Sequence, residues 1–574
     1  MHLMTSSPAQ SGARPVQPSL GSVMGAAVAA ALAVFVLRVV YLVWVCPYDL
    51  VEDEAQYWLW AQHIDWSYYS KGPGVAWAIG LSTSVFGDAE WAVRLPAAVS
   101  GLVAMACAAG LGAEAAIAAG ADERAARRAS MFAMAAFALA PVFQMTAVLM
   151  TIDGPLVACW LAAAWAAWRA LMRGSGWAWV ALGAAVAAGF LFKYTMLLVL
   201  PGLVGFAIVR RRELVLASGW RVWSCAGAVV AALGLVPVVV WNAQNDWDTV
   251  RHLLGHLGMA GGDMPVTAGG GGGRKWSPWW SLELIGMQIG LAGPGFVLGV
   301  MAAVRASRGG REGRGGRGGM GAGASMLVWC AAPVMVFYLV VSLFAEPEGN
   351  WPIAGSTTLL VLAGVWAARA REESGRGFSA RRLLWNFAIA FGVCAAPVLL
   401  RADVAAAAVT RAVQMARPEA APIRTGRLIG ARAMGEHAAE ILKELDHAVD
   451  ANRNQRRTHP FVIVEHYGRA SQMAYYLERT GKARQVYCAS AVMGGRRSQF
   501  DVWAHTSLAD PALVGRDALL LSNDKPHTLA FWGSVFERVD PILGTKLDGE
   551  HKKDRVAYIG SGYKGLASGT GERP

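Results

Sequence analysis

Charged residues are scarce in this 574-residue chain. Only 16% of the residues are charged, whereas 55% are hydrophobic. This balance excludes an ordinary soluble protein and indicates a membrane protein with room for one further domain. Cysteine pairs are also lacking, because none of the seven cysteines forms a CxxC motif and six lie in or beside apolar segments. The chain therefore offers neither a disulfide framework nor a zinc site of that kind.

A cleavable signal is another feature that we do not find. The first 22 residues are polar, and no clear small-residue cleavage site follows the apolar run after them. We therefore expect residues 1–22 to be a flexible cytoplasmic leader and the run at 23–45 to be a retained membrane anchor.

Long apolar runs dominate the next 380 residues or so, and a helix needs about 20 such residues to cross the bilayer. We expect eleven spans, at residues 23–45, 92–111, 129–149, 156–172, 177–192, 195–209, 220–241, 282–304, 325–344, 353–368 and 383–400. A shorter run at 75–86 predicts a re-entrant or interfacial helix. The expected fold is an α-helical polytopic membrane protein with about 11–13 transmembrane helices in a domain at 23–401.

Positive charge gives the predicted orientation. With the N-terminus inside, the inner loops hold clusters of arginine, whereas the outer loops hold only Lys71, Lys193, Arg251, Arg274 and Lys275. This asymmetry obeys the positive-inside rule and explains the net charge of +12 without a nucleic-acid partner. The Arg-Gly run at 308–319 falls in an inner loop, so we interpret it as a flexible basic connector.

An odd number of spans puts residues 402–574 outside the membrane. Short buried strands are predicted at 461–464, 485–489, 518–521 and 555–559, and an amphipathic helix at 434–448. This pattern predicts a C-terminal extracytoplasmic α/β domain. We find neither a nucleophile motif nor a phosphate loop in it, so its role stays open.

Polar side chains gather on the predicted outer face. They lie in the first outer loop at 46–91, at the ends of later spans, and in two outer loops that carry WNAQNDWDTVRHLLGH and EPEGNWP. Each has a plain structural explanation: an aromatic interfacial belt for the first loop, a helix cap for Asp153 and a snorkelling side chain for Lys193. Their concentration on one face favours function, because charges near hydrocarbon are costly.

Carboxylates and cations at a membrane surface suit one chemistry in particular. A carboxylate can take a proton from a hydroxyl, and Lys or Arg can hold a phosphate leaving group. Aromatic faces can support sugar rings. These groups together favour transfer of a sugar from a lipid-linked phosphate.

Several segments resemble one family. They are DEAQYWLWAQHIDWSYYSKGPGVAW, TIDGPL, GFLFKYTMLLVLPGL, WNAQNDW, GNWP and RRSQFDVW, which begin at residues 53, 151, 189, 241, 349 and 496. In this order they are similar to the bacterial GT-C membrane glycosyltransferases, both the protein O-mannosyltransferase-like and the aminoarabinose transferase-like groups. In place of the usual double proline after the lysine, this chain has Gly72-Pro73-Gly74.

The resemblance implies an inverting transfer on the external face from a polyprenyl-phosphate-linked sugar to an acceptor hydroxyl. By position, Asp53 would be the catalytic base, with Asp153 as a second acid and Glu54 beside the base. Lys71 and Lys193 would contact the donor phosphate. The remaining candidates are Arg251 and His252 for phosphate, placed by loop position, and Tyr57, Trp58, Asn242, Glu348, Asn350 and Trp351 for substrate.

The resemblance leaves several matters open. Some members bind a divalent metal and others do not, so a metal is possible and no cofactor is certain. The acceptor could be a lipid, a protein or a cell-envelope polymer, and membrane lipids are expected partners in the cell membrane. The glycine run at 269–273 would suit a lid or be a low-complexity insertion. The alternatives are a transporter or flippase of a lipid-linked saccharide, which should carry midplane charges and an internal repeat, and a non-catalytic scaffold.

Overall fold

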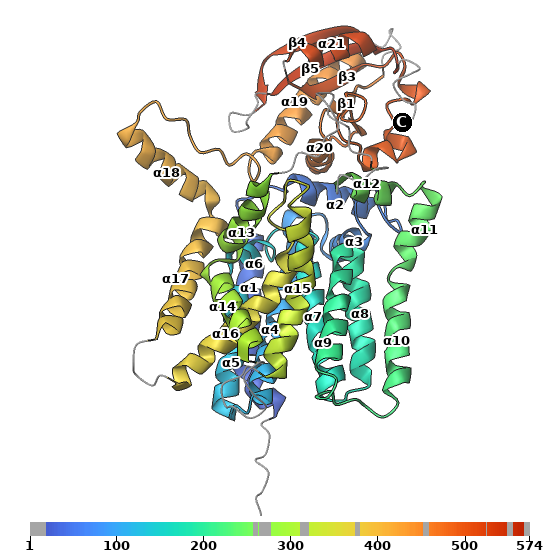
Figure 1. The fold of residues 1–574 in the computed structure, drawn as a ribbon. Helices are drawn as coiled ribbons and strands as arrows, with labels where there is room; N and C mark the ends of the chain where they lie inside the picture. Colours follow the sequence, from blue (N-terminus) through green and yellow to red (C-terminus); the bar gives the residue numbers. More distant parts are fainter. Residues whose placement is uncertain are drawn as a thin grey trace, which may run out of the picture.

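The computed structural model describes residues 19–256, 262, 277–309, 321–373, 379–451, 458–523, 525–547 and 555–566. The glycine run at 269–273 and nearly all of the leader and of the Arg-Gly run lie outside these residues. Helices make up most of the described part of the first 400 residues, and a small sheet lies in the C-terminal part (Figure 1).

The helices of the first 400 residues are α1 (Leu20–Trp44), α2 (Glu52–Gln62), α3 (Gly74–Phe86), α4 (Glu90–Ala118), α5 (Glu123–Ala138), α6 (Pro141–Met145), α7 (Asp153–Met172), α8 (Trp177–Phe192), η1 (Tyr194–Leu198), α9 (Val199–Val209), α10 (Trp220–Leu233), α11 (Val236–Gln244), α12 (Asp248–His256), α13 (Pro278–Ala292), α14 (Pro294–Gly309), α15 (Ala322–Val341), α16 (Ile353–Glu373) and α17 (Ala380–Leu400).

The protein is a multi-pass membrane protein. Within the described ranges, seven helical segments are long and apolar enough to span a bilayer, and the bent pair α13–α14 makes an eighth. The polytopic helical architecture is thus confirmed, although this count is lower than the expected eleven. The other three expected spans correspond to α5, to α8, and to η1 together with α9. Of these, α8 and the segment formed by η1 and α9 are apolar helices shorter than a full span.

Two expected spans are not straight helices, and proline accounts for both differences. The span at 129–149 is broken because α5 ends at Ala138 and α6 begins at Pro141. The span at 282–304 is bent by 113° between α13 and α14. Gly293 there has a positive φ of 72°, and Pro294 has no N–H to continue the helix.

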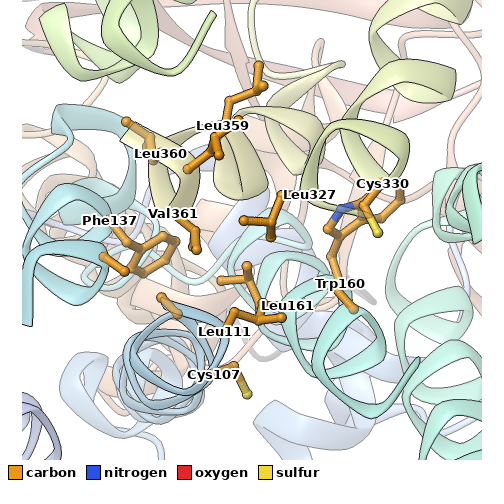
Figure 2. Close-up of a cluster of buried hydrophobic side chains, with 14 of the residues drawn as sticks. Cys107, Leu111, Phe137, Trp160, Leu161, Leu327, Cys330, Leu359, Leu360 and Val361 are labelled. Carbon is orange, nitrogen blue, oxygen red and sulfur yellow. The ribbon is translucent and has the colours of Figure 1, made fainter. Parts of the chain in front are cut away.

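The core of the bundle is packed through small residues. Leu111, Phe137, Leu161 and Leu327 come from four different helices and meet in one buried cluster (Figure 2). Many of their buried neighbours are alanines, which let helix backbones approach closely, as is common inside membranes. The tightly packed helices therefore fix the positions of the loops at their ends.

The C-terminal part contains a five-stranded sheet with the order β2-β1-β3-β5-β4. Its elements are α18 (Ala402–Ala416), α19 (Ala431–Ala451), β1 (Phe461–Val464), α20 (Tyr467–Arg479), β2 (Val486–Cys488), η2 (Gln499–Asp501), η3 (Ala504–Thr506), η4 (Pro511–Leu513), β3 (Ala518–Ser522), α21 (Pro526–Val535), β4 (Phe536–Leu547) and β5 (Arg555–Tyr563). β1 pairs in parallel with β2 and β3, whereas β5 pairs antiparallel with β3 and β4.

The α/β character expected from the sequence is confirmed. Val462 and Val464 face a layer formed by α19 and α20, while Phe461 and Ile463 face the layer that includes α21. This two-sided burial explains why β1 to β3 are short, continuous apolar runs. The strand β4 was not expected, because residues 536–547 include four charged residues and a proline. The division of the chain at residue 401 stays a prediction.

The sheet domain rests on the first loop through α20, which packs on α2 (Figure 1). The Tyr476 hydroxyl accepts a hydrogen bond from the Leu50 N–H at 2.8 Å, and Gln472 donates to the Leu50 carbonyl at 2.7 Å. Trp58 and Tyr475 form an edge-on aromatic pair with ring centroids 4.8 Å apart. The two parts of the chain thus meet in a buried, hydrogen-bonded contact.

Candidate active site

A cavity of about 1020 Å³ lies where the first loop, the ends of several membrane helices and the sheet domain meet. The residues that line it are Val51, Glu52, Asp53, Gln56, Tyr57, Tyr69, Ser70, Lys71, Thr151, Ile152, Asp153, Lys193, Glu348, Asn350, Trp351, Arg424, Gly426, Arg427, Leu428, His466, Tyr467, Arg469, Arg496, Arg497 and Ser498.

Asp53 lies in the first turn of α2, and its side chain opens into the cavity. The side chain is exposed to this open space and is surrounded by protein on its other sides. Desolvation by the surrounding protein raises the pKa of Asp53, against the opposing effect of the Lys71 charge. A carboxylate with a raised pKa is a stronger base than a solvated one, as a group that accepts a hydroxyl proton should be.

Lys71 lines the same cavity, and burial lowers its pKa to about 8, with a further contribution from the Lys193 charge. The turn that carries it depends on glycine. A Cβ on Gly72 would overlap the carbonyl oxygen of Leu191, next to the chain that leads to Lys193. The Gly-Pro-Gly sequence therefore lets the Lys71 turn pack against the end of α8.

Asp153 and Lys193 form an ion pair with 2.8 Å between Oδ1 and Nζ. Asp153 begins α7, and its Oδ2 accepts a hydrogen bond from Asn350 at 2.9 Å. Both ends of the pair are largely buried, with side-chain exposures of 12% for Lys193 and 6% for Asp153. Three segments that lie far apart in the sequence are thus fixed in one wall of the cavity.

Aromatic side chains provide two further surfaces of the cavity. Trp351 lines it and donates from Nε1 to Glu348 at 3.1 Å. Tyr57 lines it from α2, with its ring centroid 5.2 Å from that of Trp60. Of the predicted site residues, Asp53, Lys71, Asp153, Lys193, Tyr57, Glu348, Asn350 and Trp351 therefore share the cavity.

Glu54 and Trp58 do not line this cavity, in contrast to the prediction. Glu54 is fully buried and accepts two hydrogen bonds from the Arg94 guanidinium, at 2.9 and 2.7 Å. Its oxygens also accept from the N–H groups of Met150 at 2.7 Å and Val51 at 3.0 Å. Trp58 points instead toward Asp88, to which its Nε1 donates at 2.7 Å. Adjacent positions on α2 therefore face different sides, because Asp53 and Tyr57 line the cavity whereas Glu54 and Trp58 do not. The acidic cluster in the sequence does not show which residue faces the cavity.

Asn242, Arg251 and His252 also lie outside the set of lining residues. Asn242 is buried and closes the end of α11, where it donates to the Val238 carbonyl at 2.8 Å. Arg251 is exposed on α12. His252 is buried behind the cavity wall, with its Nε2 at 2.7 Å from a guanidinium nitrogen of Arg496. The assignment of these residues to the site by loop position therefore stays a prediction.

The sequence interpretation missed the wall that the C-terminal part contributes. Arg496 and Arg497 line the cavity and lie over the rings of Tyr467 and Tyr69, at 5.7 and 5.6 Å from the ring centroids. Arg469 pairs with Glu52 at 2.9 Å. The sequence did contain a signal for Arg496 and Arg497, because they are the first two residues of the RRSQFDVW segment that resembles the family. No pattern indicated Arg469.

The lining as a whole is basic. It contains seven lysine or arginine residues and four carboxylates. An electropositive cavity favours a phosphate or another anion. In the part of the chain that the structure describes, His, Cys, Asp and Glu form no group of three or more that could hold a metal ion. The described residues that line the cavity therefore do not fit a metal ion.

Comparisons with known proteins agree with this architecture. Residues 70–241 match the family model described as dolichyl-phosphate-mannose-protein mannosyltransferase. The chain is 30% identical over 338 residues to the lipid A galacturonosyltransferase RgtD of Rhizobium johnstonii, a match that covers 57% of this chain and 62% of the relative. The chain thus spans less than two thirds of that relative's length.

Solved structures give a longer match. ArnT from Cupriavidus metallidurans in the apo state is 17% identical, with a TM-score of 0.54 and coverage of 93% of this chain and 97% of that one. ArnT bound to undecaprenyl phosphate is 18% identical, with a TM-score of 0.55 and coverage of 97% and 100%. This chain has the fold of the GT-C membrane glycosyltransferases.

The resemblance indicated by the sequence motifs is thereby confirmed at the level of the fold. The segment that matches the family model includes three of the ionisable residues in the cavity, Lys71, Asp153 and Lys193. Asp53 precedes it, and the arginines of the sheet domain follow it.

Proposed function

We propose that this protein transfers a sugar from a polyprenyl-phosphate-linked donor to a hydroxyl group of a lipid acceptor on the outer face of the cell membrane. The observation that carries the proposal is the cavity itself, in which Asp53 faces a strongly basic lining at the ends of the membrane helices. The activity in the name of RgtD and the undecaprenyl phosphate bound to ArnT support the choice of acceptor and donor.

In this reaction, Asp53 accepts the proton of the acceptor hydroxyl. The oxygen forms a bond to the anomeric carbon as the bond from that carbon to the phosphate oxygen breaks, so one displacement inverts the anomeric configuration. The polyprenyl phosphate leaves with the electron pair of the broken bond. Lys71 and Arg496 offset the charge that develops on the phosphate.

Asp153 and Lys193 are positioning residues in this scheme. Their ion pair and the Asn350 amide hold the ends of three segments together. Lys193 thereby stays near Lys71, and its charge helps to lower the Lys71 pKa. Trp351 and Tyr57 offer faces on which a sugar ring can rest.

A lipid-linked saccharide transporter is the second candidate. The ionisable residues of the cavity come from helix ends and loops, such as Asp153 at the start of α7 and Lys193 at the end of α8. A transport site is expected near the middle of the bilayer. This placement favours transfer over transport.

The test uses purified full-length protein, a labelled polyprenyl-phosphate sugar and a lipid acceptor. Asp53→Asn is expected to lower kcat by about 10²–10⁴-fold, the usual contribution of a general base, while it retains donor binding. Lys71→Ala is expected to weaken donor binding. Glu440→Gln and Lys443→Ala, on the exposed face of α19, are matched controls that should leave both values unchanged. Transfer at the wild-type rate by Asp53→Asn contradicts the catalytic assignment, and translocation of the donor without transfer favours the transporter.

A further inference from the structure

The helix α18 differs from every other element near the cavity. It begins two residues after α17 ends, and none of its residues is buried. It extends away from the helical bundle at the flank formed by α17 (Figure 1). Val404, Val409, Val413 and Met415 are 53%, 48%, 42% and 82% exposed.

The sequence of α18 separates polar from apolar residues on opposite faces. Asp403, Thr410 and Gln414 are spaced by seven and four residues, so they share one face of a helix. Val409 and Val413 lie on the other side, where the remaining positions are mostly alanine. This is an amphipathic helix by pattern.

The usual relation between pattern and burial is reversed in α18. The polar face is the one that the protein covers: Thr410 accepts a hydrogen bond from the Ile423 N–H at 2.9 Å, and Gln414 donates to the Ala420 carbonyl at 3.0 Å. The chain that follows the helix thus folds back along its polar side. The apolar face points outward, which is costly in water and favourable in lipid.

The elements around α18 favour the lipid bilayer as the partner of its apolar face. α17 is a candidate membrane span with only 11% of its most apolar window buried inside the protein, so α18 emerges at a flank that already faces lipid. Residues 401–427 contain five arginines and only two carboxylates. Positive charge beside an apolar helix face attracts anionic headgroups.

We propose that α18 is an interfacial helix, which lies in the headgroup region of the bilayer with Val409, Val413 and the alanines beside them toward the acyl chains. The segment that continues from it supplies Arg424, Arg427 and Leu428 to the cavity lining. The helix thereby ties one rim of the cavity to the lipid surface. This inference is independent of the reaction catalysed.

The test places an environment-sensitive NBD fluorophore on single cysteines in the full-length protein. Exposed Cys225 and Cys394 are first replaced by serine, and the other five native cysteines by alanine. Val409→Cys reports on the apolar face, and Ala407→Cys, an exposed position on the polar side of the same helix, is the matched control. Both variants are reconstituted in phosphatidylcholine–phosphatidylglycerol vesicles with and without doxyl-labelled lipid.

The fluorophore on Val409→Cys should emit at shorter wavelength and be quenched by doxyl lipid at least about threefold more than that on Ala407→Cys. Equal quenching of the two positions by aqueous iodide, with no effect of doxyl lipid on either, would overturn the proposal. A disulfide cross-link between two unlabelled Val409→Cys chains, together with no quenching of the labelled variant by doxyl lipid, would overturn it in favour of a second copy of the protein.

Discussion

Replacing Glu54 should destabilise the protein rather than remove a catalytic group. Glu54 and Arg94 are 0% and 1% exposed, and Oε2 and Nη2 are 2.7 Å apart. Arg94 also donates to the carbonyls of Tyr48 at 2.8 Å and Asp49 at 2.7 Å, so its position is fixed. In Glu54→Gln the guanidinium stays buried without its counter-charge, which costs about 3–5 kcal/mol for a pair of this kind.

The expected result is a thermal unfolding midpoint several degrees below that of the wild type in the same detergent. Asp53→Asn is the matched control, because the Asp53 carboxylate opens into the cavity. This substitution should leave the midpoint unchanged while it strongly lowers the rate of transfer. The double variant Glu54→Leu with Arg94→Met should recover part of the loss, since a buried ion pair can be replaced by apolar side chains at little cost.

The comparison of Glu54→Gln with Asp53→Asn distinguishes a structural from a catalytic role of Glu54. If Glu54→Gln keeps the wild-type midpoint but loses transfer, Glu54 acts in the chemistry and the structural role given to it here is wrong. If the double variant is as unstable as the single one, the loss does not come from an unpaired Arg94.

Three further outcomes follow from the cavity. Transfer, measured as kcat/KM, should rise with pH as Asp53 ionises, because the base must be ionised to accept a proton. The midpoint of this rise should lie above the usual aspartate pKa, because desolvation raises the pKa of Asp53. It should fall again near pH 8, where Lys71 loses its proton; a profile that is flat from pH 4 to pH 9 would contradict both assignments. Gly72→Ala should lower the transfer rate with little change in expression, because its methyl group meets the Leu191 carbonyl, and unchanged kinetics would show that the turn adapts. Arg496→Gln should raise the donor KM by about 10–100-fold, the value of one charge-assisted hydrogen bond, as measured by donor titration.

Local sequence patterns predicted the secondary structure well where one physical requirement dominates. Spans such as α1 and α17 follow from the length of apolar chain that a bilayer needs, and β1 to β3 from short apolar runs. Breaks were harder to predict. Pro141 and Pro294 interrupt apolar runs without changing their hydrophobicity, so the sequence interpretation joined segments that the backbone separates.

The candidate site was likewise predicted only in part from the sequence. The residue types in the outer loops favour phosphate and sugar chemistry, and Asp53, Lys71, Asp153 and Lys193 meet in one cavity. Glu54 directly follows Asp53, and His252 lies in an outer loop rich in polar residues, yet Glu54 is bound by Arg94 and His252 lies behind Arg496. Burial and partners separate them, and neither is encoded in a short window.

The sequence by itself therefore determined that this is a polytopic membrane protein, which loops carry its polar chemistry, and which family its motifs resemble. These properties follow from apolar length, charge distribution and local motifs. Only the tertiary structure decided which carboxylate faces the cavity, that the arginines of the sheet domain form part of its wall, and that α18 turns its apolar face outward. Each of these depends on contacts between segments far apart in the chain, where packing and the cost of burying charge select one arrangement.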